Sequence, residues 1–191
     1  MYKIVLTAAL ALCVAGPAGA QSGAAGTPPG AAEVQSAAPK AGGGNAKLSQ
    51  AASTQSFVTK ASQGDMLELA SSKLAAEKGG AKAKDFASRM IKDHTATTAE
   101  LQALVSSGKV KAELPSAMDK EQSAKVDKLG TLSGAAFDKA YQALQVAAHK
   151  EAVPLFETYS VSGDNAELQA FAGKALPHLQ QHLKMAEDLD K

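Results

Sequence analysis

The stretch DFASRMIKDHTATTAELQAL, residues 85–104, decides both the fold and the main question about this chain. At about 100° per residue on a helical wheel, His94 falls in the middle of the apolar side. The residues within about 60° of it are Ala87, Met90, Ile91, Thr98, Leu101 and Val105. A buried imidazole without a partner costs on the order of 1–3 kcal/mol, so His94 needs a hydrogen bond, a carboxylate or a metal.

Similar helical patterns, separated by glycine and capping residues, fill the rest of the chain from residue 51. The expected helices cover about 51–78, 81–107, 116–129, 134–162 and 164–190, with no alternating strand pattern between them. Ser116 and Asp164 are the expected N-caps of the third and fifth helices, and Pro154 and Pro177 are expected to kink the last two. We predict an all-α, ferritin-like four-helix bundle with an extra short helix in the middle crossover.

The first 50 residues are predicted to lie outside this bundle. Residues 1–20 read as a signal peptide: a short positive start, an apolar run too short to span a membrane comfortably, and a small-residue cleavage site after Ala20. Residues 21–50 are rich in Gly, Ala and Pro and are predicted to be a disordered tether, which leaves 51–191 as the bundle domain. Cys13, the only cysteine, lies in the signal peptide, so the mature chain suits the periplasm and has no stable membrane span.

Several functional classes find no support in the sequence. Net charge is close to zero and no basic patch carries interleaved aromatic residues, which argues against nucleic-acid binding. No nucleophile–base–orienter set and no glycine-rich phosphate loop stand out, so a non-enzymatic protein is favoured. The sequence identifies no protein or cell-envelope partner.

Each of the four long helices offers one polar group to the interior or its margin: Glu68, His94, His149 and His182. Metal sites in bundles are built in this way, and imidazoles with a carboxylate suit Fe, Cu or Zn. His178, one turn before His182, is a weaker candidate ligand. The Glu-x-x-His pattern of di-iron bundles is absent before all three histidines. The favoured interpretation is therefore a set of core histidines hydrogen-bonded to Glu68, Tyr141 or backbone carbonyls, with Asp93 as a surface charge.

Three motifs carry a resemblance to a known family. They are Met-x-x-Asp-His at 90–94, Phe-Asp-x-x-Tyr at 137–141 and Leu-Pro-x-Leu-x-x-His at 176–182. In these the chain resembles, over about residues 56–189, the bacterial family called domain of unknown function 4142. The resemblance implies an exported protein with a ferritin-like fold, and it makes His94, His149 and His182 the characteristic histidines. It implies no agreed activity.

Three functions remain open at this stage. The first is a non-enzymatic exported protein that binds a partner or supports the envelope under stress, whose buried polar groups satisfy one another. The second is a metal-binding or redox protein that uses Glu68, His94, His149 and His182, which requires their ligand atoms to converge at one depth of the bundle. The third is a protein that holds a small apolar ligand near Pro154.

Overall fold

The computed structural model describes residues 53–190, and this part of the chain contains helices and connecting loops but no strand. The predicted signal peptide and the whole of the predicted tether lie outside the described residues. Five helices are present: α1 (Thr54–Lys78), α2 (Ala81–Ser106), α3 (Lys120–Gly130), α4 (Gly134–Ser162) and α5 (Ala166–Glu187). Their number and order agree with the sequence prediction.

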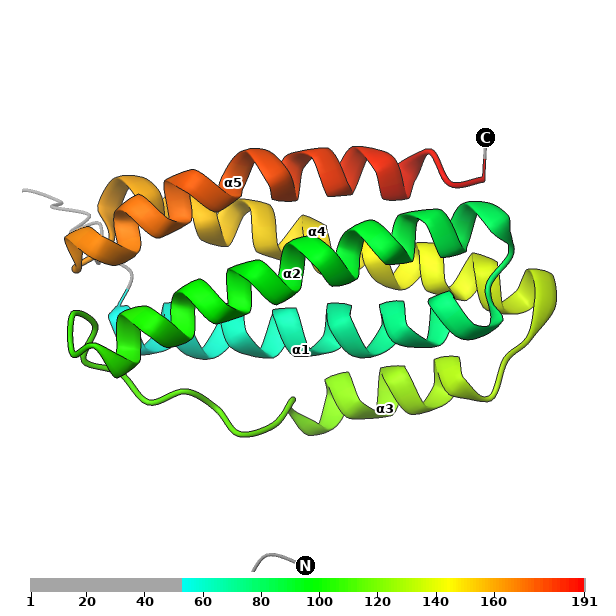
Figure 1. Cartoon of the computed structure of the whole chain (residues 1–191), viewed down its shortest axis with the longest axis horizontal. Coiled ribbons are helices and arrows are strands. Elements are labelled where there is room, and N and C mark those ends of the chain that lie inside the picture. The colour runs from blue at the N-terminus through cyan, green and yellow to red at the C-terminus, as the bar shows by residue number, and fades with distance from the viewer. Residues whose placement is uncertain (1–52, 191) are drawn as a thin grey trace, which may run out of the picture. The chain divides into compact units, whose positions relative to one another are not determined.

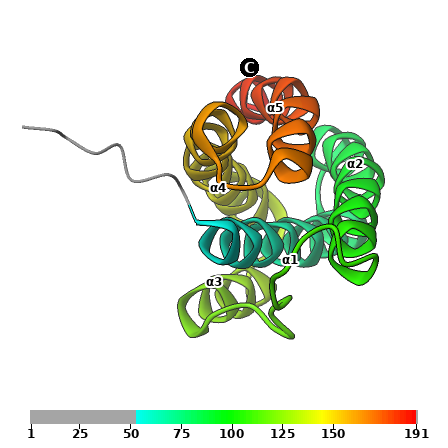
Figure 2. The same cartoon turned by 90° about the vertical axis from the view of Figure 1, so that its left-hand side faces the viewer.

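The four long helices form a bundle of two antiparallel hairpins, α1–α2 and α4–α5 (Figure 1). Viewed along the bundle, α1, α2, α5 and α4 follow one another around the core, and α3 lies outside against α1 (Figure 2). The connection from α2 to α4 passes through α3 and spans the length of the bundle. This long crossover makes every neighbouring pair of long helices antiparallel, which confirms the ferritin-like four-helix bundle.

The helix ends follow local chemistry, and two predicted caps are wrong. The N-cap of α3 is Asp119, not Ser116, because Asp119 and Gln122 form a reciprocal capping box. The N-cap of α5 is Asn165, whose side chain accepts from the backbone N–H of Leu168. The neighbouring Asp164 instead accepts hydrogen bonds from Thr54 and Tyr159, which ties the start of α1 to the α4–α5 turn.

Glycine and proline occupy defined places in these helices. Gly108, just after α2, has a φ of 75°, a conformation that ends helices and that favours glycine. Pro154 and Pro177 lie inside α4 and α5, and both helices continue through them. Because Pro154 has no N–H, the carbonyl of Lys150 loses its helical hydrogen bond.

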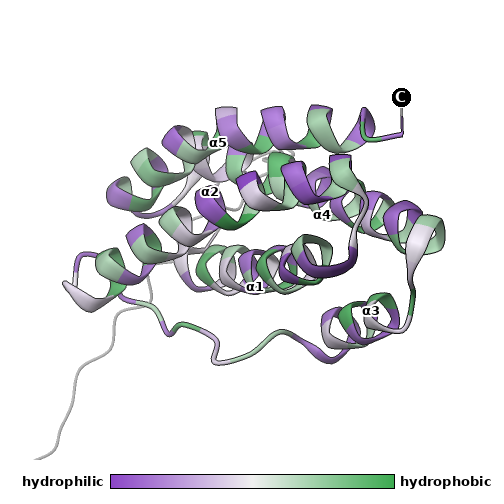
Figure 3. Ribbon diagram, turned by 45° about the vertical axis from the view of Figure 1, so that its right-hand side comes forward, coloured by the Kyte–Doolittle hydropathy of each residue, from purple (hydrophilic) through white to green (hydrophobic). Residues whose placement is uncertain are grey.

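A polar layer divides the core into two hydrophobic clusters. The cluster at one end contains Phe57, Phe156 and Tyr159, and the cluster at the other end contains Phe86, Phe137 and Tyr141. Every helix carries both hydrophilic and hydrophobic residues along its length, as expected of amphipathic helices that pack one face into a core (Figure 3). The histidines lie between the two clusters, so apolar side chains close the layer at both ends.

Candidate metal centre

Three histidine rings from three helices meet in the polar layer. His94 comes from α2, His149 from α4 and His182 from α5, and each is at most 1 % exposed. Their ring centroids are 5.7 Å apart for His94 and His149, 5.5 Å for His149 and His182, and 5.3 Å for His94 and His182. These distances show that the three rings lie against one another in the core. We call them the histidine trio.

One nitrogen of His94 is held by carboxylates from α1. Its Nδ1 lies 2.8 Å from Oδ1 of Asp65 and 3.2 Å from Oε2 of Glu68. Since a carboxylate only accepts hydrogen bonds, Nδ1 carries a proton and its N–H donates a hydrogen bond to Asp65. The other oxygen of Asp65 accepts from the hydroxyl of Thr98 at 2.8 Å, which fixes the carboxylate in place.

The other two histidines are oriented in the same manner. Nδ1 of His149 donates to the backbone carbonyl of Gln145 at 2.9 Å, one turn earlier in α4. Nε2 of His182 donates to Oδ2 of Asp93 at 2.9 Å, across the α2–α5 interface. Both acceptors lack a proton to give, so they settle which ring nitrogen is protonated.

The second nitrogen of each ring has no hydrogen-bond partner among the described residues. These atoms are Nε2 of His94, Nε2 of His149 and Nδ1 of His182, and all three are buried. One ring nitrogen from each histidine lies within 4.8 Å of the other two. Buried polar atoms without a partner are rare in folded proteins, so three in one layer need an explanation.

Burial and neighbouring charges separate the pKa values of the trio. Burial lowers the pKa of His149 to about 3 and the pKa of His182 to about 4, so both rings are neutral at pH 7. Burial also disfavours the charged form of His94, but the carboxylates of Glu68 and Asp65 outweigh it and raise its pKa to about 9. His149 and His182 therefore each keep a free lone pair at neutral pH.

Glu68 belongs to a second group of ligand atoms rather than to the trio. It is 2 % exposed. Glu68, Asp65 and His94 each offer one ligand atom, and these three atoms lie within 4.8 Å of one another. Burial raises the pKa of Glu68 to about 7, against the pull of His94. Its Oε1 has no hydrogen-bond partner in the described part of the chain and lies 3.4 Å from Nδ1 of His149.

The structure thus brings all four predicted residues together but corrects their surroundings. Asp93 is not a free surface charge, because it orients His182 from the neighbouring helix. The hydroxyl of Tyr141 pairs with Ser72 at 2.8 Å, where the sequence had suggested a histidine as its partner. His178 is exposed and stands outside the trio. The favoured interpretation of hydrogen-bonded core histidines describes one nitrogen of each ring and leaves the other unexplained.

Three further residues of the polar layer were not predicted from the sequence: Asp65, Gln145 and Ser71. Asp65 is 6 % exposed although it lies about 60° from Glu68 on the α1 wheel, toward a side that also carries polar Ser62. A pattern based on apolar residues assigns that side to solvent. The Asp-x-x-Glu spacing of Asp65 and Glu68 is the signal that was available. Gln145 donates to the hydroxyl of Ser71 and extends the polar layer toward α1.

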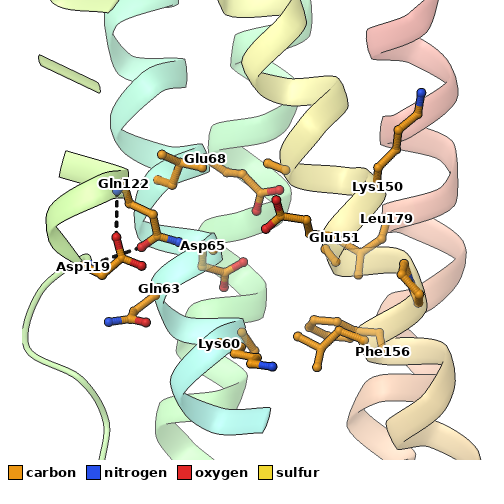
Figure 4. Close-up of a pocket in the computed structure, with 17 residues that line it drawn as sticks. Lys60, Gln63, Asp65, Glu68, Asp119, Gln122, Lys150, Glu151, Phe156 and Leu179 are labelled. Carbon is orange, nitrogen blue, oxygen red and sulfur yellow. Dashed lines mark hydrogen bonds between the residues drawn. The ribbon is translucent and has the colours of Figure 1, made fainter. Parts of the chain in front are cut away.

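Two pockets approach the polar layer from different sides. A pocket of about 160 Å³ between α2 and α5 reaches His94 and His182, and exposed His178 is in its wall. A larger pocket of about 600 Å³ reaches the carboxylates of Asp65 and Glu68 between α1 and α4 (Figure 4). The larger pocket also contains Pro154, but charged side chains line it, which disfavours a purely apolar ligand there.

Comparison with known proteins identifies the family. The family model described as domain of unknown function (DUF4142) matches residues 37–189. The chain belongs to the DUF4142 family. This confirms the family suggested by the three motifs, and no curated protein matches the chain.

Two solved structures share the fold of this DUF4142 protein. A DUF305 fragment from Deinococcus radiodurans superposes with a TM-score of 0.62 at 14 % identity, covering 71 % of this chain and 93 % of that one. CopM in the Cu(II)-bound form superposes with a TM-score of 0.60 at 15 % identity, covering 72 % and 95 %. At these identities the likeness extends to the fold alone. Among residues 53–190, no helix has the length and apolar character needed to cross a membrane.

Proposed function

We propose that this DUF4142 protein is a non-enzymatic metal-binding protein whose centre is the histidine trio. The observation that carries the proposal is the set of three buried, unpartnered ring nitrogens on neighbouring helices. The opposite nitrogen of each ring donates to Asp65, to the Gln145 carbonyl or to Asp93. Metal-bound histidines are typically oriented by this kind of outer hydrogen bond, which fixes the tautomer and the ring direction.

The energetic argument favours a ligand over an empty polar layer. Each buried polar atom without a partner costs roughly 1–3 kcal/mol. Three such atoms together cost several kcal/mol, a large fraction of the stability of an ordinary domain. A metal bound by all three nitrogens would offset this cost. A layer with no ligand to bind would avoid the same cost more simply if apolar residues stood in place of the three histidines.

The ligand chemistry favours copper or zinc. Imidazole nitrogens suit Zn, Cu, Fe and Ni, while Mg and Ca prefer oxygen ligands. His149 and His182 are already neutral at pH 7, and a metal at the trio would displace the Nε2 proton of His94. Affinity for nitrogen sites is highest for Cu²⁺ among the first-row divalent ions. The fold similarity to CopM, solved in its Cu(II)-bound form, supports trying copper first. Three histidines leave a further coordination position for water.

The test is metal content by mass spectrometry on protein purified without an affinity tag or chelator. We expect metal bound in wild-type protein and absent from a His94→Ala, His182→Ala double variant. His178→Ala is the matched control, because His178 is on the same helix as His182 but outside the trio, and it should retain its metal. Equal metal in the double variant and the wild type would refute the proposal, provided that thermal melting shows both to be folded.

We also propose that the protein acts in the periplasm, after export and cleavage behind Ala20. The support is the N-terminal sequence alone: a short positive start, an apolar run and a small-residue cleavage site. The mass of the protein in a periplasmic extract tests this. A mature chain beginning at Gln21 is expected, and a cytoplasmic chain that retains Met1 would contradict it.

A further inference from the structure

We propose a second divalent-cation site, formed by Asp65, Glu68 and Nδ1 of His94, that shares the His94 ring with the trio. The bridging role of His94 rests on the proposed function, since it requires a metal at Nε2. The second site itself rests on separate observations: the ligand spacing on the Nδ1 side, a buried unpartnered oxygen, and a pocket that reaches both carboxylates.

The spacing of the ligand atoms fits a coordination sphere. Nδ1 of His94 lies 2.8 Å from Oδ1 of Asp65 and 3.2 Å from Oε2 of Glu68. Two ligands bound at about 2.1 Å, at angles of about 90–110°, are themselves roughly 3 Å apart. A cation could therefore replace the Nδ1 proton with little movement of the three side chains.

The carboxylate side of His94 also has an unused ligand atom. Oε1 of Glu68 has no hydrogen-bond partner among residues 53–190. The side chain is only 3 % exposed, so water does not reach this oxygen freely. Thr98 holds the far oxygen of Asp65, which directs Oδ1 toward His94. A carboxylate that is fixed by an outer hydrogen bond is the usual arrangement for a metal ligand.

The pocket of about 600 Å³ gives a cation a route and room for water. Asp65 and Glu68 line it, and acidic residues outnumber basic ones in its wall. Figure 4 shows the side chains of Glu68 and Glu151 pointing toward each other from α1 and α4. Glu151 is exposed, so it lies where an incoming cation would first meet a carboxylate.

The proposed binding step is a simple exchange. The Nδ1 proton of His94 leaves to solvent, and the lone pair that it frees bonds to the cation together with the oxygens of Asp65 and Glu68. Because the pKa of His94 is about 9, its Nε2 also carries a proton at pH 7, and this second proton leaves to solvent when the trio binds its metal. With metal at both nitrogens, His94 is an imidazolate bridge. Two Cu²⁺ ions joined in this way couple magnetically, so their electron paramagnetic resonance signal is weaker than their number predicts.

The experiment uses the full chain, stripped of metal and dialysed against Zn²⁺ or Cu²⁺. We expect two metals per chain in the wild type, one in Glu68→Gln and one in His182→Ala. Glu157→Gln removes an exposed carboxylate from α4 and should keep two. In the copper form, the resonance intensity per copper should be less than half in the wild type and should recover fully in Glu68→Gln.

Each outcome separates the second site from the first. One metal in the wild type that is kept in Glu68→Gln and lost in His182→Ala would overturn the second site while leaving the histidine trio as a metal centre. One metal that is lost in Glu68→Gln and kept in His182→Ala would overturn the trio as a metal centre, and with it the bridge through His94. No metal in any variant would overturn the proposed function as well. Melting of the metal-free variants checks that each is folded before its metal is counted.

Discussion

Replacing Asp65 by alanine should destabilise the metal-free protein strongly at pH 7. Asp65 accepts two hydrogen bonds in the polar layer, from Nδ1 of His94 and from the hydroxyl of Thr98, both at 2.8 Å. It is 6 % exposed, so its two hydrogen bonds lie in a largely buried layer. Alanine leaves a buried imidazolium and a half-buried hydroxyl without their acceptor.

The expected loss is about 3 kcal/mol in the free energy of unfolding. Removing one member of a buried ion pair typically costs about 3–5 kcal/mol. The low end applies here because Glu68 remains 3.2 Å from Nδ1 of His94 and still compensates part of its charge. For a domain of this size, that loss corresponds to a fall of roughly 10 °C in the melting temperature.

Urea unfolding followed by circular dichroism measures this loss on protein stripped of metal. Asp127→Ala, which removes an exposed carboxylate from α3, is the control and should stay within about 0.5 kcal/mol of the wild type. Asp65→Asn should fall between the two, because the amide oxygen still accepts from His94. A loss below about 1 kcal/mol for Asp65→Ala would show that the pair does not hold His94 as described.

Three further predictions concern pH, packing and access. The metal-free protein should be most stable near pH 6.5 in a pH series of urea melts. Just below pH 6.5, His149 and His182 take up protons only in the unfolded chain, because folding lowers their pKa values to about 3 and 4. Glu68 takes up one proton only in the folded chain, because folding raises its pKa to about 7. The net difference of one proton lowers stability by roughly 1 kcal/mol per pH unit. Above pH 6.5, His94 with its pKa of about 9 stays protonated only when folded, so stability falls with rising pH, and a monotonic profile would contradict these assignments. Gly163→Ala should cost about 1–3 kcal/mol, because its Cβ would overlap the buried Tyr159 ring. Gly64→Ala, whose Cβ would meet open space beside α1, should stabilise by up to about 1 kcal/mol, and equal effects of the two variants in thermal melts would refute the packing. His178→Ala should slow Cu²⁺ uptake in stopped-flow several-fold without changing the final content, because His178 lines the pocket that reaches His94 and His182, and an unchanged rate would exclude this pocket as the route.

The fold could be predicted from the sequence because its signals are local. Glycines at the helix ends, capping patterns and helical periodicity marked all five helices, and the extra short helix indicated the long crossover. The errors fell at helix starts, where Ser116 and Asp119, or Asp164 and Asn165, offer equivalent side-chain acceptors a few residues apart. Tertiary contacts decide which of two neighbouring acceptors caps a helix. Asp164 accepts hydrogen bonds from Thr54 and Tyr159, and Asn165 caps α5 in its place.

The candidate site could be predicted only in part. His94, His149, His182 and Glu68 were found because each is a polar residue on or beside an apolar stripe. Their common depth in the bundle depends on the relative shift of the four helices, which periodicity within one helix does not contain. Asp93 was misjudged for the same reason, since its partner His182 belongs to another helix. Glu68 forms a separate ligand group with Asp65 and His94, and this grouping could not be predicted because Asp65 was not recognised as a buried residue.

The most direct test of the central claim is a crystal structure of the zinc- or copper-loaded protein, with anomalous scattering recorded at the metal edge. Our account predicts a peak about 2.0–2.1 Å from Nε2 of His94, Nε2 of His149 and Nδ1 of His182. A peak confined to the surface, at His178 or elsewhere, with the trio empty in metal-loaded crystals, would contradict it.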